Sequence, residues 1–163
     1  MLCTIILMML DTIPNLLPEV TIFDNHQQRV ELLARLVYSE AGNQSYQGKL
    51  AVANVVLNRM EFFEKSLEET IYKPNQFTGV RSKWFKRKYD IDSYKAALEV
   101  LSGYRFIQPD ILYFANPRRS TNKTWLLFVG KFKAFQIEDH TFYYDVHARL
   151  LYQYTLRSYK DKP

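Results

Sequence analysis

Apolar side chains recur at intervals of three and four residues in the first half of the chain and gather in short blocks in the second half. Between Gln28 and Ala41 they fall on one side of a helix, with Arg35 and Ser39 on the other side. The spacing predicts a core helix over residues 28–41. Its apolar positions are Val30, Leu33, Ala34, Val37 and Ala41.

A polar hinge follows this helix. Gly42 and Asn43 suit a left-handed helix end, and Ser45 suits the first cap of a second helix that reaches about Arg59. The second helix carries Leu50, Ala51, Val52, Val55 and Val56 on its apolar side. The pattern therefore predicts two packed helices joined by a short turn.

Two further helices carry clear start signals. Ser66 and Glu69 have capping-box spacing, which predicts a short helix. Asp92 or Ser93 suits the cap of a helix that ends near Gly103.

Beyond Pro109 the blocks "ILYFAN", "WLLFVG", "KAFQI" and "HTFYYD" are short and rich in aromatic or β-branched residues. They predict an antiparallel sheet of three or four strands. The tail from residue 146 returns to helical spacing with a basic end. Helices followed by strands predict an α+β domain, with an N-terminal segment at 1–26, a main domain at 27–145 and a basic helical tail at 146–163.

The composition narrows the partners. The 163 residues fit one domain. A formal charge of +5 suits a polyanionic partner such as a bacterial wall polymer, a nucleic acid or an anionic membrane. The alternative is a solvated basic surface without a dedicated partner. A single cysteine, Cys3, excludes an internal disulfide, and His26, His140 and His147 lack ligand spacing. We therefore expect no metal and no cofactor.

The opening "MLCTIILMML" is apolar but too short to span a bilayer. It has no basic start and no clear small-x-small cleavage site, so we expect a packed N-terminal segment rather than a signal peptide.

Two loops, "KPNQFTGV" and "FANPRRSTNKTW", combine amide and aromatic side chains that suit a sugar: Asn75, Gln76, Phe77, Asn116 and Trp125. Amides bind hydroxyl and N-acetyl groups, and aromatic faces cover pyranose rings. Each residue alone has a structural alternative, because Asn-Pro forms turns and Phe77 suits a core. Together they indicate a binding groove between helices and sheet.

The motifs "LARLVYSEAGNQSYQGKLAVANVVLNRM", "IYKPNQFTGV", "YKAALEVLSG", "LYFANP" and "HTFYY" follow one another over roughly residues 30 to 144. In this order the chain resembles the bacterial cell-wall hydrolases that include the catalytic domain of spore cortex-lytic enzymes and many phage-encoded wall enzymes. The resemblance implies a fold related to lysozyme and to resuscitation-promoting factors. It also implies action at the cell wall on peptidoglycan, with delivery by lysis, by a phage particle or by an unrecognised export route.

The resemblance implies cleavage between N-acetylmuramic acid and N-acetylglucosamine, with Glu40 as the catalytic acid. Many relatives carry further acids in the hinge, whereas this chain has Gln44 and Gln47 there, so Glu40 is the only carboxylate between Glu31 and Glu61. One carboxylate suffices for a lytic transglycosylase, in which the C6 hydroxyl of the substrate attacks the anomeric carbon.

A conventional muramidase needs a second carboxylate. Acids that could fold back over the groove are Asp90, Asp92, Glu138, Asp139 and Asp145. For Glu40 itself, a partly apolar site and the negative end of its helix both predict a raised pKa, as a general acid needs.

Tyr113 and His140 are further candidate substrate contacts, although Tyr113 and Tyr143 also suit packing, and His140 suits a hydrogen-bonded strand turn.

The basic residues Lys83, Lys86, Arg87 and Lys88, together with Arg118 and Arg119 near the groove, would attract an anionic wall or form a solvated surface loop. Two alternatives to an enzyme remain open. One is a catalytically inert wall-binding or phage-particle module. The other is nucleic-acid binding through Trp84 or Phe85, although we expect no specific nucleic-acid partner.

Overall fold

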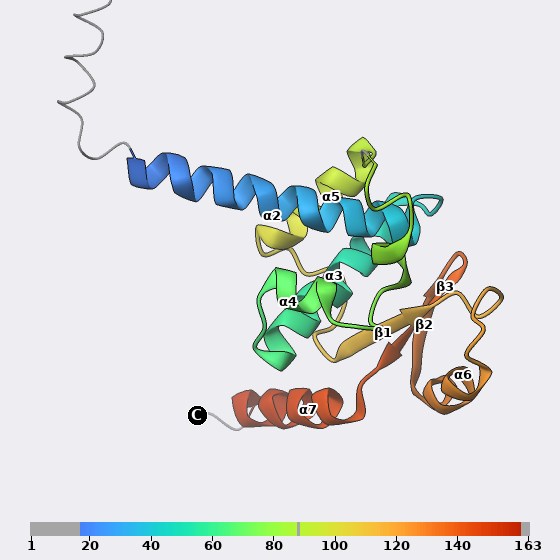
Figure 1. Ribbon diagram of the computed structural model, residues 1–163. Coiled ribbons are helices and arrows are strands. Elements are labelled where there is room, and N and C mark those ends of the chain that lie inside the picture. Colours follow the sequence, from blue (N-terminus) through green and yellow to red (C-terminus); the bar gives the residue numbers. More distant parts are fainter. Residues whose placement is uncertain (1–16, 88, 161–163) are drawn as a thin grey trace, which may run out of the picture.

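Helices α2 (Leu17–Ala41), α3 (Tyr46–Phe63) and α5 (Ile91–Leu101) pack against one another in the computed structural model of the protein (Figure 1). The structure describes residues 17–87 and 89–160. The expected packing of the N-terminal segment at residues 1–16, with Cys3, and the contribution of Lys88 to the basic loop lie outside the described residues.

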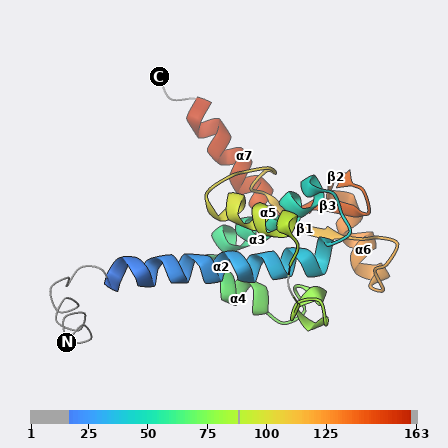
Figure 2. The same cartoon turned by 90° about the horizontal axis from the view of Figure 1, so that it is seen from above.

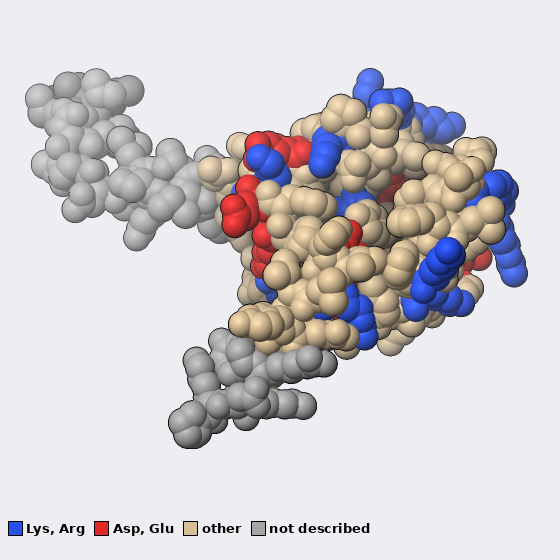
Figure 3. Space-filling model, turned by 90° about the horizontal axis from the view of Figure 1, so that it is seen from below, with Lys and Arg blue, Asp and Glu red and all other residues tan. Residues whose placement is uncertain are grey.

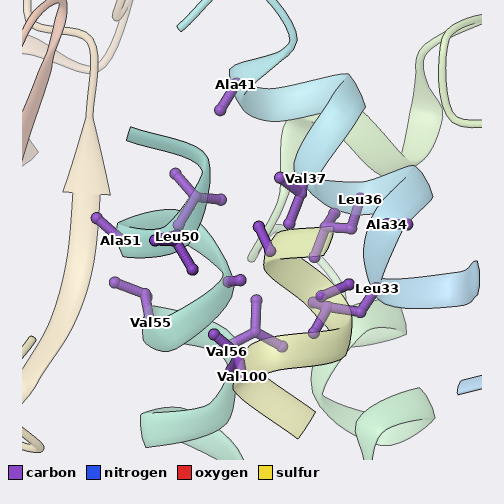
Figure 4. Packing of buried hydrophobic residues seen from close by; sticks show 14 of the residues in the cluster. Leu33, Ala34, Leu36, Val37, Ala41, Leu50, Ala51, Val55, Val56 and Val100 are labelled. Carbon is purple, nitrogen blue, oxygen red and sulfur yellow. The ribbon is translucent and has the colours of Figure 1, made fainter. Parts of the chain in front are cut away.

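The core lies where these three helices meet (Figure 4). Leu33 and Val37 of α2, Val55 and Val56 of α3 and Val100 of α5 are all buried. Each such side chain stabilises the fold by about 1.5–3 kcal/mol relative to an exposed position. Because this core fixes the last turns of α2 against α3, it also fixes the position of Glu40.

The predicted helices are confirmed, with α2 starting earlier than the periodicity indicates. Ser45 caps α3 by accepting the N–H of Gly48, and the capping box of Ser66 and Glu69 begins α4 (Leu67–Tyr72). These caps are local and depend on a few adjacent residues, which is why the sequence reveals them.

Two predicted helix ends are wrong. Asp90, not Asp92 or Ser93, caps α5: its Oδ1 accepts the N–H of Ser93 at 2.7 Å, while its Oδ2 lies 2.7 Å from the buried Nζ of Lys49. The ion pair with α3 holds Asp90 at the start of α5.

Neither Gly42 nor Asn43 adopts a positive φ, so the hinge is not a left-handed cap. Gly42 instead allows close packing, because a Cβ there would lie 2.5 Å from the carbonyl oxygen of Tyr38.

The sheet has the order β1-β3-β2 and is antiparallel throughout. Its strands are β1 (Ile111–Ala115), β2 (Lys133–Ile137) and β3 (His140–Tyr144). Phe142 in the central strand pairs with Phe114 on one side and Phe135 on the other. The sheet lies beside the helical layer, with β1 next to α3 (Figure 1), so the predicted α+β arrangement is confirmed.

The block "WLLFVG" is a helix, and its prediction as a strand is wrong. It forms α6 (Lys123–Val129), which continues into the 3-10 turn η3 (Gly130–Phe132). Asn122 accepts the N–H of Trp125 at 2.9 Å and so starts the helix. Periodicity alone does not separate a short apolar run in a helix from one in a strand.

The tail forms the predicted helix, α7 (Val146–Lys160), which leads away from the sheet (Figure 2). Asp145 begins it by accepting the N–H groups of His147 and Ala148. No helix within the described ranges combines the length and apolarity needed to cross a bilayer.

Candidate active site

A cleft of about 590 Å³ lies between the end of α2, the loop that leads into the 3-10 turn η2 (Thr78–Arg81), strand β1 and the loop before α6. All eight residues that the sequence predicts as catalytic or substrate-binding line it: Glu40, Asn75, Gln76, Phe77, Tyr113, Asn116, Trp125 and His140. They come from segments spread over a hundred positions of the chain, and the tertiary fold brings them to one opening.

Glu40 sits in the last turn of α2 and is half-buried. Its Oε1 accepts the backbone N–H of Gly79 at 2.5 Å. Burial raises the pKa of Glu40, while the Gly79 N–H, the charge of Arg59 and the Thr78 hydroxyl act in the opposite direction. The raised pKa agrees with the expectation for a general acid.

Arg59 of α3 is a charged residue of this cleft that the sequence reasoning did not identify. It is 7% exposed, and its Nε donates to the carbonyl oxygen of Leu112 at 2.7 Å. Its guanidinium lies 4.8 Å from the ring centroid of Phe77 and 5.3 Å from that of Tyr113. Burial lowers its pKa to about 10, so it stays charged at neutral pH. The available signal was a cation in the mostly apolar stretch "AVANVVLNRM", whose only other polar residues are Asn54 and Asn58.

Aromatic rings form one wall of the cleft. Trp125 meets Tyr113 edge-to-face at 6.3 Å between centroids and Tyr143 at 5.9 Å. The Tyr113 hydroxyl donates to Oδ2 of Asp145 at 2.9 Å, and burial raises its pKa to about 12. Tyr143 is buried, as its packing interpretation predicts, whereas Tyr113 both packs and lines the cleft.

The amides Asn75 and Asn116 shape the loops around the cleft. Asn116 Oδ1 accepts the backbone N–H groups of Arg118 and Arg119, which is the turn that an Asn-Pro pair favours. Asn75 has a positive φ of 63°, and its Oδ1 accepts from Arg81 at 3.4 Å. Both residues therefore serve the local structure as well as lining the opening.

His140 starts β3 at the inner side of the cleft and is 6% exposed. Burial lowers its pKa, so the ring is neutral at neutral pH. It lies edge-on to Phe114 at 5.3 Å. Its Nδ1 has no hydrogen-bond partner among the described residues, so the interpretation as a hydrogen-bonded strand turn does not hold for this nitrogen.

Glu40 is the only carboxylate among the described residues that line the cleft. The candidate second acids lie elsewhere, and three of them have defined partners. Asp90 pairs with Lys49, Glu138 accepts the N–H of Ser45 at 2.7 Å, and Asp145 begins α7. In the hinge, the side chain of Gln44 accepts the N–H of Asp139 at 3.2 Å, which connects the helical layer to the β2–β3 turn.

Polar residues that the sequence reasoning did not single out complete the lining. They are Ser39, Asn43, Thr78, Ser120, Thr121 and Asn122.

Comparison with solved structures identifies the fold. The chain is similar to the catalytic domain of the germination-specific lytic transglycosylase SleB from Bacillus anthracis, with a TM-score of 0.63 and 28% identity over 72% of this chain and 94% of that domain. The SleB catalytic domain from Bacillus cereus gives a TM-score of 0.59 and 30% identity, over 72% of this chain and 90% of that one. The predicted α+β, lysozyme-like class is thereby confirmed.

The chain belongs to the Cell Wall Hydrolase family, whose model matches residues 43–143. Glu40 lies three positions before the matched residues. The resemblance drawn from the sequence motifs is confirmed.

Among curated relatives, the spore cortex-lytic enzyme of Bacillus subtilis is 32% identical over 57% of this chain and 31% of its own length. The spore cortex-lytic enzyme of Oceanobacillus iheyensis is 30% identical over 64% of this chain and 39% of its own length. The cell wall hydrolase CwlJ of Bacillus subtilis is 29% identical over 70% of this chain and 83% of its own length. The chain thus spans about a third of the spore cortex-lytic enzymes that it matches and most of CwlJ.

Proposed function

We propose that this protein cleaves the glycan strands of peptidoglycan between N-acetylmuramic acid and N-acetylglucosamine, as a lytic transglycosylase with Glu40 as its single acid and base. The observation that carries the proposal is the half-buried Glu40, with its raised pKa, as the only carboxylate among the described residues of the cleft. The similarity to the catalytic domain of a lytic transglycosylase supports it.

The chemistry needs one proton and returns it. Protonated Glu40 gives its proton to the glycosidic oxygen, and the bond between that oxygen and C1 of the muramic acid breaks. The C6 hydroxyl oxygen of the same sugar bonds to C1, and its proton passes to the Glu40 carboxylate. The products are a 1,6-anhydromuramyl end and a free N-acetylglucosamine hydroxyl, and Glu40 is ready for another cycle.

The surroundings of Glu40 suit both halves of this cycle. Burial keeps the carboxyl protonated to higher pH before the bond breaks. Afterwards the carboxylate is held by the Gly79 N–H, and its negative charge stabilises the positive charge that develops at C1. Burial favours the protonated form of Glu40, whereas the Gly79 N–H and the charge of Arg59 favour the carboxylate, so Glu40 can exist in either form.

The remaining cleft residues are proposed substrate contacts. The rings of Tyr113 and Trp125 offer apolar faces to pyranose rings, Asn75 and Gln76 supply amides from the loop before η2, and Asn116 supplies one from the loop that leads to α6. Phe77 is buried beneath them, beside Arg59. His140 is neutral and can accept or donate a hydrogen bond to a sugar hydroxyl.

Basic side chains suit action at an anionic wall. Lys and Arg are spread over the face in Figure 3, where most of the visible Asp and Glu lie toward the left and only small acidic patches lie elsewhere. Arg119 lines the cleft itself. We propose that this charge concentrates the protein on peptidoglycan, whose peptides carry carboxylates.

The test compares Glu40→Gln with wild type on purified sacculi, with soluble fragments identified by mass spectrometry. We expect a loss of rate of at least about a hundredfold, the lower end for removal of a general acid. The matched control is Glu68→Gln, an exposed glutamate of α4 that does not line the cleft. Circular dichroism of all three proteins checks that they fold.

The products separate the alternatives. Anhydro-ended fragments from wild type support the proposal, and a near-normal Glu40→Gln variant contradicts it. Reducing ends would indicate a muramidase that uses water, so the transglycosylase route would be wrong. Binding to sacculi with no release of fragments would instead favour an inert wall-binding module.

A further inference from the structure

A second cavity, of about 430 Å³, opens on the far side of Arg59. It lies between the end of α3, helix α4 and the loop that follows α4, and we call it the α3–α4 cavity. Arg59 and Gln76 line both this cavity and the cleft that contains Glu40. The two spaces are therefore neighbours on either side of these two side chains, as a branched ligand that entered both would require.

Two buried polar atoms on residues that line the α3–α4 cavity have no hydrogen-bond partner among the described residues. They are Nη1 of Arg59 and Oγ1 of Thr70, on side chains that are 7% and 6% exposed. Buried polar groups are normally paired, and each unpaired one costs about 1–3 kcal/mol. Both atoms are closed off from solvent, so a ligand in the cavity would reach them only if the Arg59 or Thr70 side chain turned toward it.

The charge of the α3–α4 cavity is positive. Arg59, Lys65 and Lys73 face a single acid, Glu69. Glu69 is already engaged, because its carboxylate accepts the N–H of Ser66 at 2.9 Å and lies 3.9 Å from Nζ of Lys65. An incoming carboxylate would meet unbalanced positive charge here.

The walls of the cavity also offer apolar surface. Phe63 and Tyr72 line it, and both rings are exposed. Nζ of Lys73 lies 5.1 Å from the Phe63 ring centroid, so a cation and a ring share one side of the opening. A ligand that matches these walls carries carboxylates for the cations and small apolar side chains for the rings. A short acidic peptide has both.

We infer that the α3–α4 cavity binds the acidic peptide branch that the lactyl group of muramic acid carries in peptidoglycan. The inference builds on the proposed function, because it requires the glycan strand to lie in the Glu40 cleft. With the sugar in that cleft, the peptide branch leaves it past Arg59 and Gln76. Its carboxylates meet Lys65, Lys73 and Arg59, and its backbone passes Thr70, whose hydroxyl becomes available when the side chain turns toward the cavity.

The inference predicts that the protein prefers glycan strands that carry peptides. The test measures kcat/KM on peptide-bearing strands and on strands whose peptides have been removed by an amidase. Thr70→Val removes the hydroxyl at similar volume, and Lys73→Gln removes one charge. We expect each to lower kcat/KM on peptide-bearing strands by about fivefold to tenfold, the size of one ordinary hydrogen bond or one partly screened charge.

The matched control is Lys95→Gln, which removes the same charge from the exposed side of α5. It corrects for the general attraction between a basic protein and an anionic wall. Thermal unfolding of every variant reports whether the fold survives. The expected result is a preference for peptide-bearing strands that Thr70→Val and Lys73→Gln reduce and Lys95→Gln retains.

Equal losses on both kinds of strand would overturn the inference, since the cavity would then bind glycan. Unchanged kcat/KM in both variants would also overturn it. A second measurement does not depend on turnover: a soluble muramyl peptide is titrated into the Glu40→Gln protein and into its Thr70→Val and Lys73→Gln derivatives. If wild type cleaves neither strand, the proposed function fails, and this titration alone decides the peptide site.

Discussion

The backbone N–H of Gly79 donates to Oε1 of Glu40 across 2.5 Å, joining the first turn of η2 to the last turn of α2. A Cβ at position 79 would lie 2.8 Å from that same oxygen and closer still to Oγ of Ser39. A glycine is needed here for close approach, not for an unusual backbone conformation, since its φ is not positive. The position of the Glu40 carboxyl therefore depends on residue 79 having no side chain.

Gly79→Ala should displace Glu40 and reduce turnover on sacculi by about tenfold to a hundredfold, because small errors in the position of a catalytic group are costly. The matched control is Gly130→Ala, since a Cβ at position 130 would meet nothing within 4 Å. Rates and unfolding temperatures of both variants make the measurement. Normal turnover by a folded Gly79→Ala protein would show that this contact does not position the acid.

Glu40→Gln should make the protein more stable at neutral pH while it loses activity. Burial raises the pKa of Glu40 in the folded state above its unfolded value, so the folded state holds the proton more tightly. The stabilisation by protonation is complete below the unfolded pKa and is lost as the pH rises through the folded pKa. Glutamine is neutral at every pH and escapes this loss.

Unfolding temperatures of wild type and Glu40→Gln, measured from about pH 4 to pH 8, check this prediction. The two proteins should coincide at the acidic end and separate toward neutral pH, by about 2–4 °C for each kcal/mol. A variant that is less stable than wild type at neutral pH would argue that the carboxylate is stabilised in the fold.

Arg59→Met should move the basic limb of the pH–rate profile to higher pH. The charge of Arg59 lowers the pKa of Glu40, in opposition to burial, so its removal leaves the carboxyl protonated to higher pH. The variant also leaves the carbonyl oxygen of Leu112 without its Arg59 partner, a cost of about 1–3 kcal/mol to the free energy of unfolding.

Arg59→Lys is the conservative comparison, because it keeps a positive charge without the planar group that lies against Phe77 and Tyr113. Its basic limb should move less than that of Arg59→Met. If the basic limb of the pH–rate profile is the same in wild type, Arg59→Met and Arg59→Lys, then Arg59 does not act on Glu40 through its charge.

Activity on sacculi should fall as salt rises, since the chain carries a formal charge of +5 and Arg119 lines the cleft. Arg119→Gln should lower the rate several-fold at low ionic strength and approach wild type at high ionic strength, where charges are screened over about 3–8 Å. Lys95→Gln, with the same loss of charge on α5, serves as the control. A loss that salt does not diminish would assign Arg119 a direct contact with substrate.

The helices were predictable because their signals are local. The apolar positions of α2 and α3, the Ser45 cap and the capping box at Ser66 depend on residues within one or two turns of each other. Asp90 was missed as the α5 cap because its partner Lys49 lies 41 positions away. The α6 block was misjudged because five apolar residues in a row fit either a helix or a strand, and a single side chain, Asn122, decides between them.

The sequence by itself determined the kinds of side chain that would line the cleft and the isolation of Glu40 from other acids nearby along the chain. Only the tertiary structure decided that no second carboxylate of the described residues reaches the cleft, that Arg59 joins it, and that Gly79 holds the acid. The reason is physical: helix caps and periodicity are set by neighbouring residues, whereas the protonation of a carboxyl depends on every charge, dipole and apolar group that folding brings within a few ångströms of it.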